Sequence, residues 1–155
     1  MHLIFAVDGS DGITRALFQS MQAFIESDLK SYNLSEDKVV VDVLQYGDNV
    51  QVLMNGLRSK DDLREQLTLL KLKQLPRGVR RMDLVLDKAS DLFASGKSTK
   101  KVLVLLTGGG SDMNSLDKLQ TSVGKLRNDM VGSHFSIFSK SILYILIFLF
   151  VSLDS

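Results

Sequence analysis

Hydrophobic residues occur along the chain in two patterns, unbroken runs and spaced stripes. The runs LIFAV (3–7) and KKVLVLLTGGG (100–110) are typical of strands buried on both faces of a sheet. The segments KVVVDVLQYG (38–47) and NVQVLMNG (49–56) are rich in β-branched residues. Turn-forming residues separate the two segments, so they predict an antiparallel hairpin. SHFSIFS (133–139) predicts one further strand.

Between the runs, apolar residues recur at helical spacing and predict amphipathic helices. The first helix ends at about Lys30, the second covers residues 60–73 after an N-cap at Ser59, and the third covers residues 81–94. A fourth helix follows the second long apolar run. The apolar stripes of the first, third and fourth helices are Ile13, Leu17, Met21, Phe24 and Leu29; Met82, Leu86, Ala89 and Phe93; and Leu116, Leu119, Val123, Leu126 and Met130.

The alternation of strands and helices predicts an α/β domain. Its central sheet is expected to be mainly parallel, with one antiparallel edge hairpin and helices on both faces. In such sheets ligands bind beyond the carboxyl ends of the strands. Two glycine-rich strand ends, DGSDG (8–12) and TGGGSD (107–112), are therefore predicted to lie together at one sheet edge. Within the hairpin, we expect Asp42 to point outward and Tyr46 to serve in packing.

The composition fits one globular domain and narrows the classes of partner. The chain has 155 residues, of which 45% are hydrophobic and 24% charged, and its net charge is +1. This balance provides no strong field for nucleic acid or for an acidic membrane. Cysteine is absent and the two histidines, His2 and His134, lie far apart in sequence, which argues against thiolate catalysis, a histidine-rich metal cage and a serine–histidine triad. The N-terminal sequence lacks the basic segment of a signal peptide.

Three short motifs resemble parts of enzyme sites but lack essential features. SGKST (95–99) copies the end of a phosphate-binding loop, yet Asp91 stands where the first glycine is required. FAVDGS is similar to the nucleophile loop of haloacid-dehalogenase-type phosphatases, but Ala6 replaces the nucleophilic aspartate. TGGGSD lacks the glycine spacing of a dinucleotide-binding turn. A small α/β phosphatase or nucleotide-binding protein is therefore the least favoured functional hypothesis.

Segments from most of the chain, taken in order, resemble a von Willebrand factor A domain. They are HLIFAVDGSDG, VVVDVLQYGDNVQVLMNG, MDLVLDKASDLF, KKVLVLLTGGGSD and VGKLRNDMVGSHFSIF. Order and spacing follow that family over about residues 2–138, and the sequence is most similar in character to the A modules of type VI-like collagens and related matrix proteins. The resemblance implies a Rossmann-like fold and a role in adhesion or matrix assembly, not catalysis. It also implies protein partners, such as collagen or other matrix proteins, and an extracellular location.

The resemblance further implies a metal-ion-dependent adhesion site. In the family a magnesium or manganese ion lies at the top of the sheet, and an acidic residue of the partner completes its coordination. By this resemblance Asp8 and Ser10 match the first two ligands. Gly12, Val79 and Gly108 stand at or near the positions of the other three ligands, and none of them has a side-chain oxygen. The site is accordingly expected to be a remnant that has lost its ion.

Neighbouring residues leave alternatives open at this site. The oxygens outside the family positions belong to Asp11, Ser111 and Asp112. A metal-dependent adhesion module that recruits Asp11 or Asp112 as a substitute ligand is the second functional hypothesis. The loop that supplies the family threonine also contains Arg77, Arg80 and Arg81. A guanidinium directed at the site would replace the cation as the partner of Asp8, whereas solvated arginines would leave the site open.

The end of the chain departs from the family pattern. We assign residues 1–139 to an incomplete A domain and residues 140–155 to a tail that does not belong to the family. A complete A domain continues after its fifth strand with a helix, a sixth strand and a final helix, whereas residues 142–151 here are all apolar. These residues are fewer than the roughly 20 that a membrane-spanning helix requires. The Ile and Phe content of the tail permits a sixth strand that is buried on both faces. The favoured origin is an unrelated end left by truncation, alternative splicing or an imperfect gene model, and such an end is still able to pack as a strand or helix where family elements are missing.

Overall fold

The computed structural model describes residues 1–32, 34, 39–57, 59, 61–62, 65–66, 78–109, 116–128, 134–140 and 143–151, the last two ranges by their backbone. The strands are β1 (His2–Asp8), β2 (Val40–Tyr46), β3 (Val50–Leu57), β4 (Lys100–Thr107), β5 (His134–Lys140) and β6 (Leu143–Val151). The helices are α1 (Arg15–Leu29), α3 (Met82–Ser95) and α4 (Leu116–Asn128). All six strands belong to one sheet, in the order β3–β2–β1–β4–β6–β5.

The centre of the sheet is parallel, as the sequence predicts. Strand β1 pairs in parallel with both β2 and β4, and β2 continues into the antiparallel hairpin with β3. Within the tail, residues 143–151 form strand β6, which lies between β4 and β5 and is antiparallel to both. The tail therefore contains a sixth strand. Together with β5, this strand forms a second antiparallel hairpin that the family pattern did not predict. No helix within the described ranges is long and apolar enough to cross a membrane.

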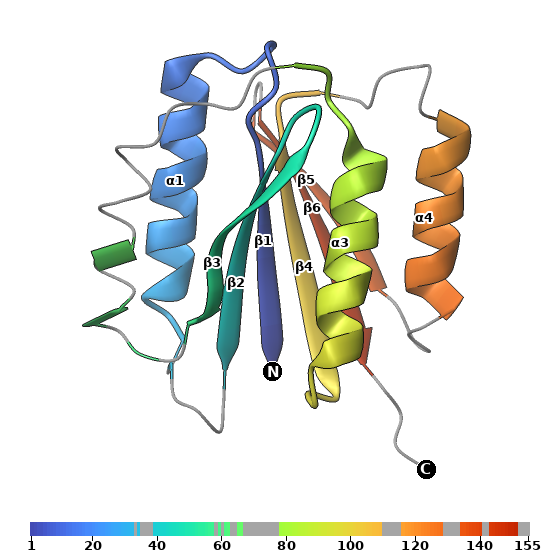
Figure 1. Cartoon of the computed structure of the whole chain (residues 1–155). Helices are drawn as coiled ribbons and strands as arrows, with labels where there is room; N and C mark the ends of the chain where they lie inside the picture. The colour runs from blue at the N-terminus through green and yellow to red at the C-terminus, as the bar shows by residue number, and fades with distance from the viewer. Residues whose placement is uncertain are drawn as a thin grey trace.

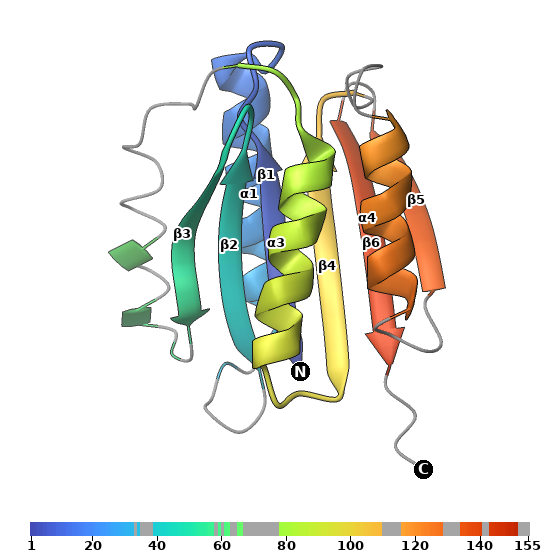
Figure 2. The same cartoon turned by 45° about the vertical axis from the view of Figure 1, so that its right-hand side comes forward.

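Helices cover both faces of the sheet. Helix α1 lies on one face, and α3 and α4 lie on the other (Figures 1 and 2). Alternate residues of β1 point to opposite faces. Leu3 and Phe5 pack in the cluster that contains the buried side of α1, whereas Ile4 and Ala6 pack in the cluster that contains α3. Because all four side chains are buried, β1 is the central, two-sided strand that its unbroken apolar run predicts.

The predicted helix stripes largely match the buried faces. Met82, Leu86, Ala89 and Phe93 of α3 are all buried. In α1 the prediction missed Phe18 and Ile25, which are buried, and its Leu17 and Phe24 are only partly buried. The Ser59 cap is confirmed, because its Oγ accepts a hydrogen bond from the Asp62 amide at 3.1 Å. Most of the predicted helix 60–73 lies outside the described residues.

The prediction that Asp42 points outward is wrong. Its side chain is 2% exposed, and its Oδ2 lies 2.6 Å from His2 Nε2. Its Oδ1 accepts a hydrogen bond from the Gly56 amide at 2.6 Å. The pairing of β2 with β3 shifts register on both sides of Val43, and Gly56 has a positive φ of 68°. This irregularity turns a backbone amide towards Asp42, which a strictly alternating strand pattern does not reveal.

Candidate interaction site at the carboxyl ends of β1 and β4

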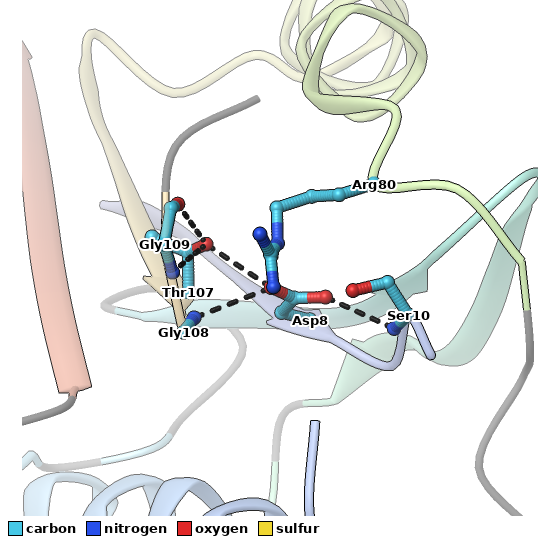
Figure 3. Close-up of polar contacts among 6 residues, drawn as sticks. All are labelled: Asp8, Ser10, Arg80, Thr107, Gly108 and Gly109. Carbon is cyan, nitrogen blue, oxygen red and sulfur yellow. Dashed lines mark hydrogen bonds and ion pairs between the residues drawn. The ribbon is translucent and has the colours of Figure 1, made fainter. Parts of the chain in front are cut away.

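Asp8 lies at the carboxyl end of β1 and is the centre of a buried polar cluster. Its side chain is completely buried. Oδ1 accepts a hydrogen bond from the Ser10 amide at 3.0 Å. Oδ2 accepts hydrogen bonds from the Thr107 hydroxyl at 3.1 Å and from the Gly108 amide at 3.2 Å, as Figure 3 shows. In their described residues, 8–12 and 107–109, the two glycine-rich strand ends therefore meet at one edge of the sheet, as predicted.

Arg80 supplies the positive charge at this cluster. Its side chain extends from the loop before α3 towards Asp8, and its Nε donates to Asp8 Oδ2 at 2.5 Å (Figure 3). The Arg80 side chain is 18% exposed and that of Asp8 is not exposed at all. The loop arginines were predicted either to pair with Asp8 or to be solvated. Arg80 pairs with Asp8.

Arg81, the next residue, pairs with a different carboxylate. Arg81 turns away and donates from Nε and Nη2 to the two carboxylate oxygens of Asp83, at 2.8 and 2.6 Å. This hydrogen bonding lowers the pKa of Asp83, against an opposing effect of burial. Arg77 lies outside the described residues. Among the described arginines of the loop, Arg80 is therefore the one whose ion pair with Asp8 the structure shows.

The path of the loop before α3 directs Arg80 to Asp8. The Gly78 carbonyl accepts a hydrogen bond from the Asp11 amide at 3.0 Å, and the Gly47 carbonyl accepts one from the Arg81 amide at 3.0 Å. Gly78 has a φ of 105°, and a Cβ on it would lie 2.5 Å from Asp48 Cγ. Only glycine combines this conformation with this close approach. The loop is thus fixed between the β1–α1 connection and the β2–β3 turn.

Three glycines surround the Arg80 guanidinium. A Cβ on Gly12 would lie 3.2 Å from Nη2, and a Cβ on Gly109 would lie 3.1 Å from Nη1. A Cβ on Gly108 would lie 3.7 Å from Nη2 and only 2.5 Å from Ile13 Cδ1. The family resemblance predicts metal ligands at Gly12 and Gly108. The guanidinium lies in the space beside Asp8 that a side chain at Gly12 would enter, whereas a side chain at Gly108 would first meet Ile13 and Leu17.

One buried hydroxyl group near Asp8, that of Ser10, has no hydrogen-bond partner among the described residues. The Ser10 hydroxyl points towards Asp8 in Figure 3. Burial, and then the negative charge of Asp8, raise the pKa of the Tyr46 hydroxyl well above its usual range, while Thr107 and Arg80 act in the opposite direction. The hydrogen bond of Thr107 to Asp8 and the closeness of Tyr46 to Asp8 are not predicted by the sequence pattern, although Thr107 begins the segment TGGGSD that is predicted to lie at this edge.

The remaining residues named from the sequence lie around this cluster. Val79, near the family threonine position, is 49% exposed. Asp11 is exposed and contacts Gly78 through its backbone amide. Ser111 and Asp112 lie outside the described residues. Within the described part of the chain, no group of three or more histidine and acidic side chains gathers in a way that could hold a metal ion.

Comparisons with known proteins agree with this architecture. Residues 2–138 match the von Willebrand factor type A domain family. The chain is 26% identical over 137 residues to the mouse collagen alpha-5(VI) chain, a match that covers 85% of this chain and 5% of the collagen chain. It is 25% identical over 125 residues to the human collagen alpha-5(VI) chain, covering 77% and 5%. The chain thus spans about a twentieth of the length of these relatives.

Solved structures show the same fold. The structure of proximal thread matrix protein 1 from the mussel byssus matches with a TM-score of 0.64 and 17% identity, over 80% of this chain and 35% of that protein. The manganese-loaded TRAP protein of Plasmodium vivax matches with a TM-score of 0.55 and 20% identity, over 61% and 39%. At these identities the similarity supports the fold alone.

Proposed function

Because the chain belongs to the von Willebrand factor type A domain family, we propose that it is a non-enzymatic protein-interaction module of extracellular-matrix type that binds its partner without a divalent ion. The observation that carries this proposal is the buried ion pair between Arg80 and Asp8 at the carboxyl ends of β1 and β4. The similarity to collagen alpha-5(VI) chains supports collagens and other matrix proteins as the partner class, and an extracellular location.

The side chains at the site do not fit a magnesium or manganese ion. Magnesium requires near-octahedral oxygen ligands and gives up its waters reluctantly. Asp8 supplies the anionic oxygens, but Oδ2 already accepts from Arg80, Thr107 and Gly108, and Oδ1 accepts from Ser10. A guanidinium at 2.5 Å from the same carboxylate repels a second cation. Asp8 and Ser10 are therefore proposed to be the remnant of the family site.

The surface beside this cluster supports a role in protein binding. Val79 follows Gly78 in the loop before α3, and it is one of two large hydrophobic side chains that are exposed in the described part of the chain; the other is Val52 on β3. An exposed apolar side chain next to a rigid polar cluster is a suitable contact for a protein surface. The proposed contact face therefore includes Val79 and the loop that holds Arg80.

The same geometry argues against hydrolysis at this site. A nucleophilic serine needs a base within hydrogen-bond distance of its hydroxyl. Ser10 Oγ has no hydrogen-bond partner among the described residues, and Asp8 is already paired with Arg80. A phosphatase assay with a generic aryl phosphate is expected to give no turnover above that of an Asp8→Asn variant.

A solid-phase binding assay tests the proposal. The chain is applied to a panel of immobilised matrix proteins that includes triple-helical collagens, once with magnesium and manganese and once with a chelator. We expect saturable binding to at least one of them, with equal affinity in both buffers. Val79→Glu is expected to weaken this binding at least tenfold, and the matched Val52→Glu variant on β3 is expected to leave it unchanged. Absence of binding to the whole panel, or equal effects of the two variants, contradicts the proposal.

A metal-dependent module is the second candidate function. The buried Ser10 hydroxyl without a described partner favours it, because such a group is suited to a small ligand, and the exposed Asp11 lies one residue further along the same loop. In that case the chelator abolishes binding and Asp11→Asn weakens it. The two candidates therefore give opposite results in the same assay.

The family domain is proposed to cover residues 1–139, and the segment 140–155 is proposed to be an addition to it. The family match ends at residue 138, which supports this division. Strand β6 nevertheless pairs with β4 along eight residue positions, Lys100–Thr107. The addition is therefore part of the same sheet although it lies outside the family match.

A further inference from the structure

We propose that Arg80 is the resident cation of this domain: its guanidinium fills a fitted pocket, formed by Asp8 and the three glycines Gly12, Gly108 and Gly109, in place of a divalent ion. This inference rests on the proposed function in one respect, namely that the interaction face works without a metal. It adds that the pocket is selective for a guanidinium group and that its occupancy fixes the fold at this edge of the sheet.

Two of these glycines, Gly12 and Gly109, lie against the guanidinium, whereas a Cβ on Gly108 would first meet Ile13. Among the described glycines, only Gly56 and Gly78 have a positive φ, so the backbone at Gly12, Gly108 and Gly109 is open to other residues. What a Cβ would meet at Gly12 and Gly109 is Arg80 alone, at 3.2 and 3.1 Å. Such contacts are tighter than ordinary van der Waals separation. A methyl group at either position therefore requires the guanidinium to shift by a few tenths of an ångström.

Arg80 compensates the buried negative charge of Asp8 and so stabilises the fold. Asp8 is fully buried and lies in a layer of apolar strands, where an unpaired carboxylate is strongly unfavourable. The backbone amides of Ser10 and Gly108 reduce this penalty but bring no net charge. Arg80 contributes the compensating positive charge at 2.5 Å, from a side chain that is itself only 18% exposed. A guanidinium stays charged at every physiological pH, so this compensation is permanent.

A regulatory consequence follows for the interaction face. A bound divalent ion makes such a face responsive to the free concentration of the ion, whereas a cation that belongs to the chain does not. The loop 78–81 is also held by backbone hydrogen bonds to Asp11 and Gly47. The face is therefore expected to keep one conformation over the whole range of magnesium, manganese and calcium concentrations.

Chemical rescue tests whether the pocket takes a guanidinium. In Arg80→Ala, the atoms removed beyond Cβ correspond to ethylguanidinium. We expect this variant to lose about 10 °C in Tm, as for removal of one partner of a buried ion pair. Ethylguanidinium at about 20 mM, far below the molar range in which guanidinium denatures proteins, is expected to restore at least half of that loss in a saturable manner. The matched control is Arg81→Ala, whose partner Asp83 lies outside the pocket, and it is expected to show no rescue.

Rescue experiments with metal ions distinguish a guanidinium pocket from a metal site that Arg80 only covers. Equal or better rescue of Arg80→Ala by magnesium or manganese overturns the inference, because the pocket is then a metal site that Arg80 only covers. Rescue by propylammonium equal to that by ethylguanidinium also overturns it, because the pocket then recognises charge alone. None of these measurements uses a binding partner. Their results therefore do not depend on the result of the matrix-binding assay.

A double-mutant cycle provides a test that does not need Arg80→Ala to fold well. Gly109→Ala in the otherwise unmodified chain is expected to lower Tm by several degrees, because its methyl group meets Nη1. In an Arg80→Lys background, where the side chain has no planar fork against Gly109, the same substitution is expected to change Tm by less than about one degree. A neutral Gly109→Ala in the unmodified chain, or an equal loss in both backgrounds, contradicts the proposed pocket.

Discussion

His2 and Asp42, on the neighbouring strands β1 and β2, form a buried pair with 2.6 Å between Nε2 and Oδ2. The other carboxylate oxygen of Asp42 binds the Gly56 amide on the edge strand β3. The ring of His2 also packs edge-on against Phe93 of α3, with 5.1 Å between the ring centroids. This pair therefore ties three strands and one helix together near the amino end of β1, while Asp8 organises its carboxyl end.

Replacement of Asp42 is expected to be strongly destabilising. Asp42→Ala leaves two buried donors, the Gly56 amide and the His2 ring, without their acceptor, and we expect the free energy of unfolding to fall by about 2–5 kcal/mol. Asp42→Asn keeps an oxygen for Gly56 and is expected to lose about 1–3 kcal/mol. Urea unfolding followed by circular dichroism measures both values. A decrease in unfolding free energy of less than about 0.5 kcal/mol for Asp42→Ala would mean that the His2–Asp42 pair does not stabilise the fold.

Tyr46 predicts a dependence of stability on alkaline pH. The pKa of its hydroxyl is raised in the folded state by burial and by the charge of Asp8. The folded state therefore favours the neutral phenol over the phenolate. For a raised pKa, the stability is fully present below the unfolded value of about 10 and is lost as pH rises above it. We expect the unmodified chain to lose about 1.4 kcal/mol per pH unit above that value relative to Tyr46→Phe. Tyr32→Phe, at a partly exposed tyrosine whose pKa is raised mainly by burial, is the matched control, with a smaller effect expected. Identical profiles for Tyr46→Phe and the unmodified chain contradict this account.

Leu105 tests the central sheet. It lies on β4 opposite Ala6 of β1, is 1% exposed and belongs to the cluster under α3. Leu105→Ala is expected to cost about 2–5 kcal/mol of unfolding free energy, as for other large-to-small changes in a core. Val52→Ala, at a valine that is 40% exposed, is expected to change it by no more than about 0.5 kcal/mol. Thermal and chemical denaturation of the two variants side by side give the comparison.

The sequence predicts the parallel centre of the fold well because its signals are local. The run 3–7 is apolar at every position, which identifies a strand with two buried faces without knowledge of its neighbours. Asp8 is placed correctly for a related reason, since it follows that run directly. The orientation of Asp42, which was predicted wrongly, depends on His2, 40 residues away, and on an irregular pairing with β3. Contacts between residues so far apart in the sequence cannot be predicted from the periodicity of hydrophobic positions.

The candidate site is predictable in position but not in its contacts. Arg80 and Arg81 are adjacent and chemically identical, yet one binds Asp8 and the other binds Asp83. What separates them is the backbone path through Gly78, which its φ of 105° and the hydrogen bonds of Asp11 and Gly47 determine. The family resemblance predicts that Gly12 and Gly108 replace metal ligands. That the Arg80 guanidinium lies against Gly12 and Gly109 follows only from the three-dimensional arrangement.

A variant designed from this geometry serves as the positive control for metal binding. Gly12→Ser and Gly108→Asp restore family ligands, and Arg80→Met removes the competing charge while it keeps most of the side-chain volume. Ile13→Val is added because a Cβ on Gly108 would lie 2.5 Å from Ile13 Cδ1, the methyl group that valine lacks. This quadruple variant is expected to bind manganese with at least tenfold higher affinity than the same chain with Arg80 retained. Equal affinity with and without Arg80 indicates that the guanidinium does not compete with the ion.

Calorimetric titration of the unmodified chain with magnesium and manganese tests the central claim most directly. Asp8 contributes one buried charge that Arg80 already compensates, and Gly12, Val79 and Gly108 contribute no side-chain oxygen. Backbone carbonyls and water do not replace the missing charge. We predict no saturable heat at millimolar concentrations of either ion. Saturable binding in the micromolar range by the unmodified chain contradicts the account and shows that the site still holds a metal ion.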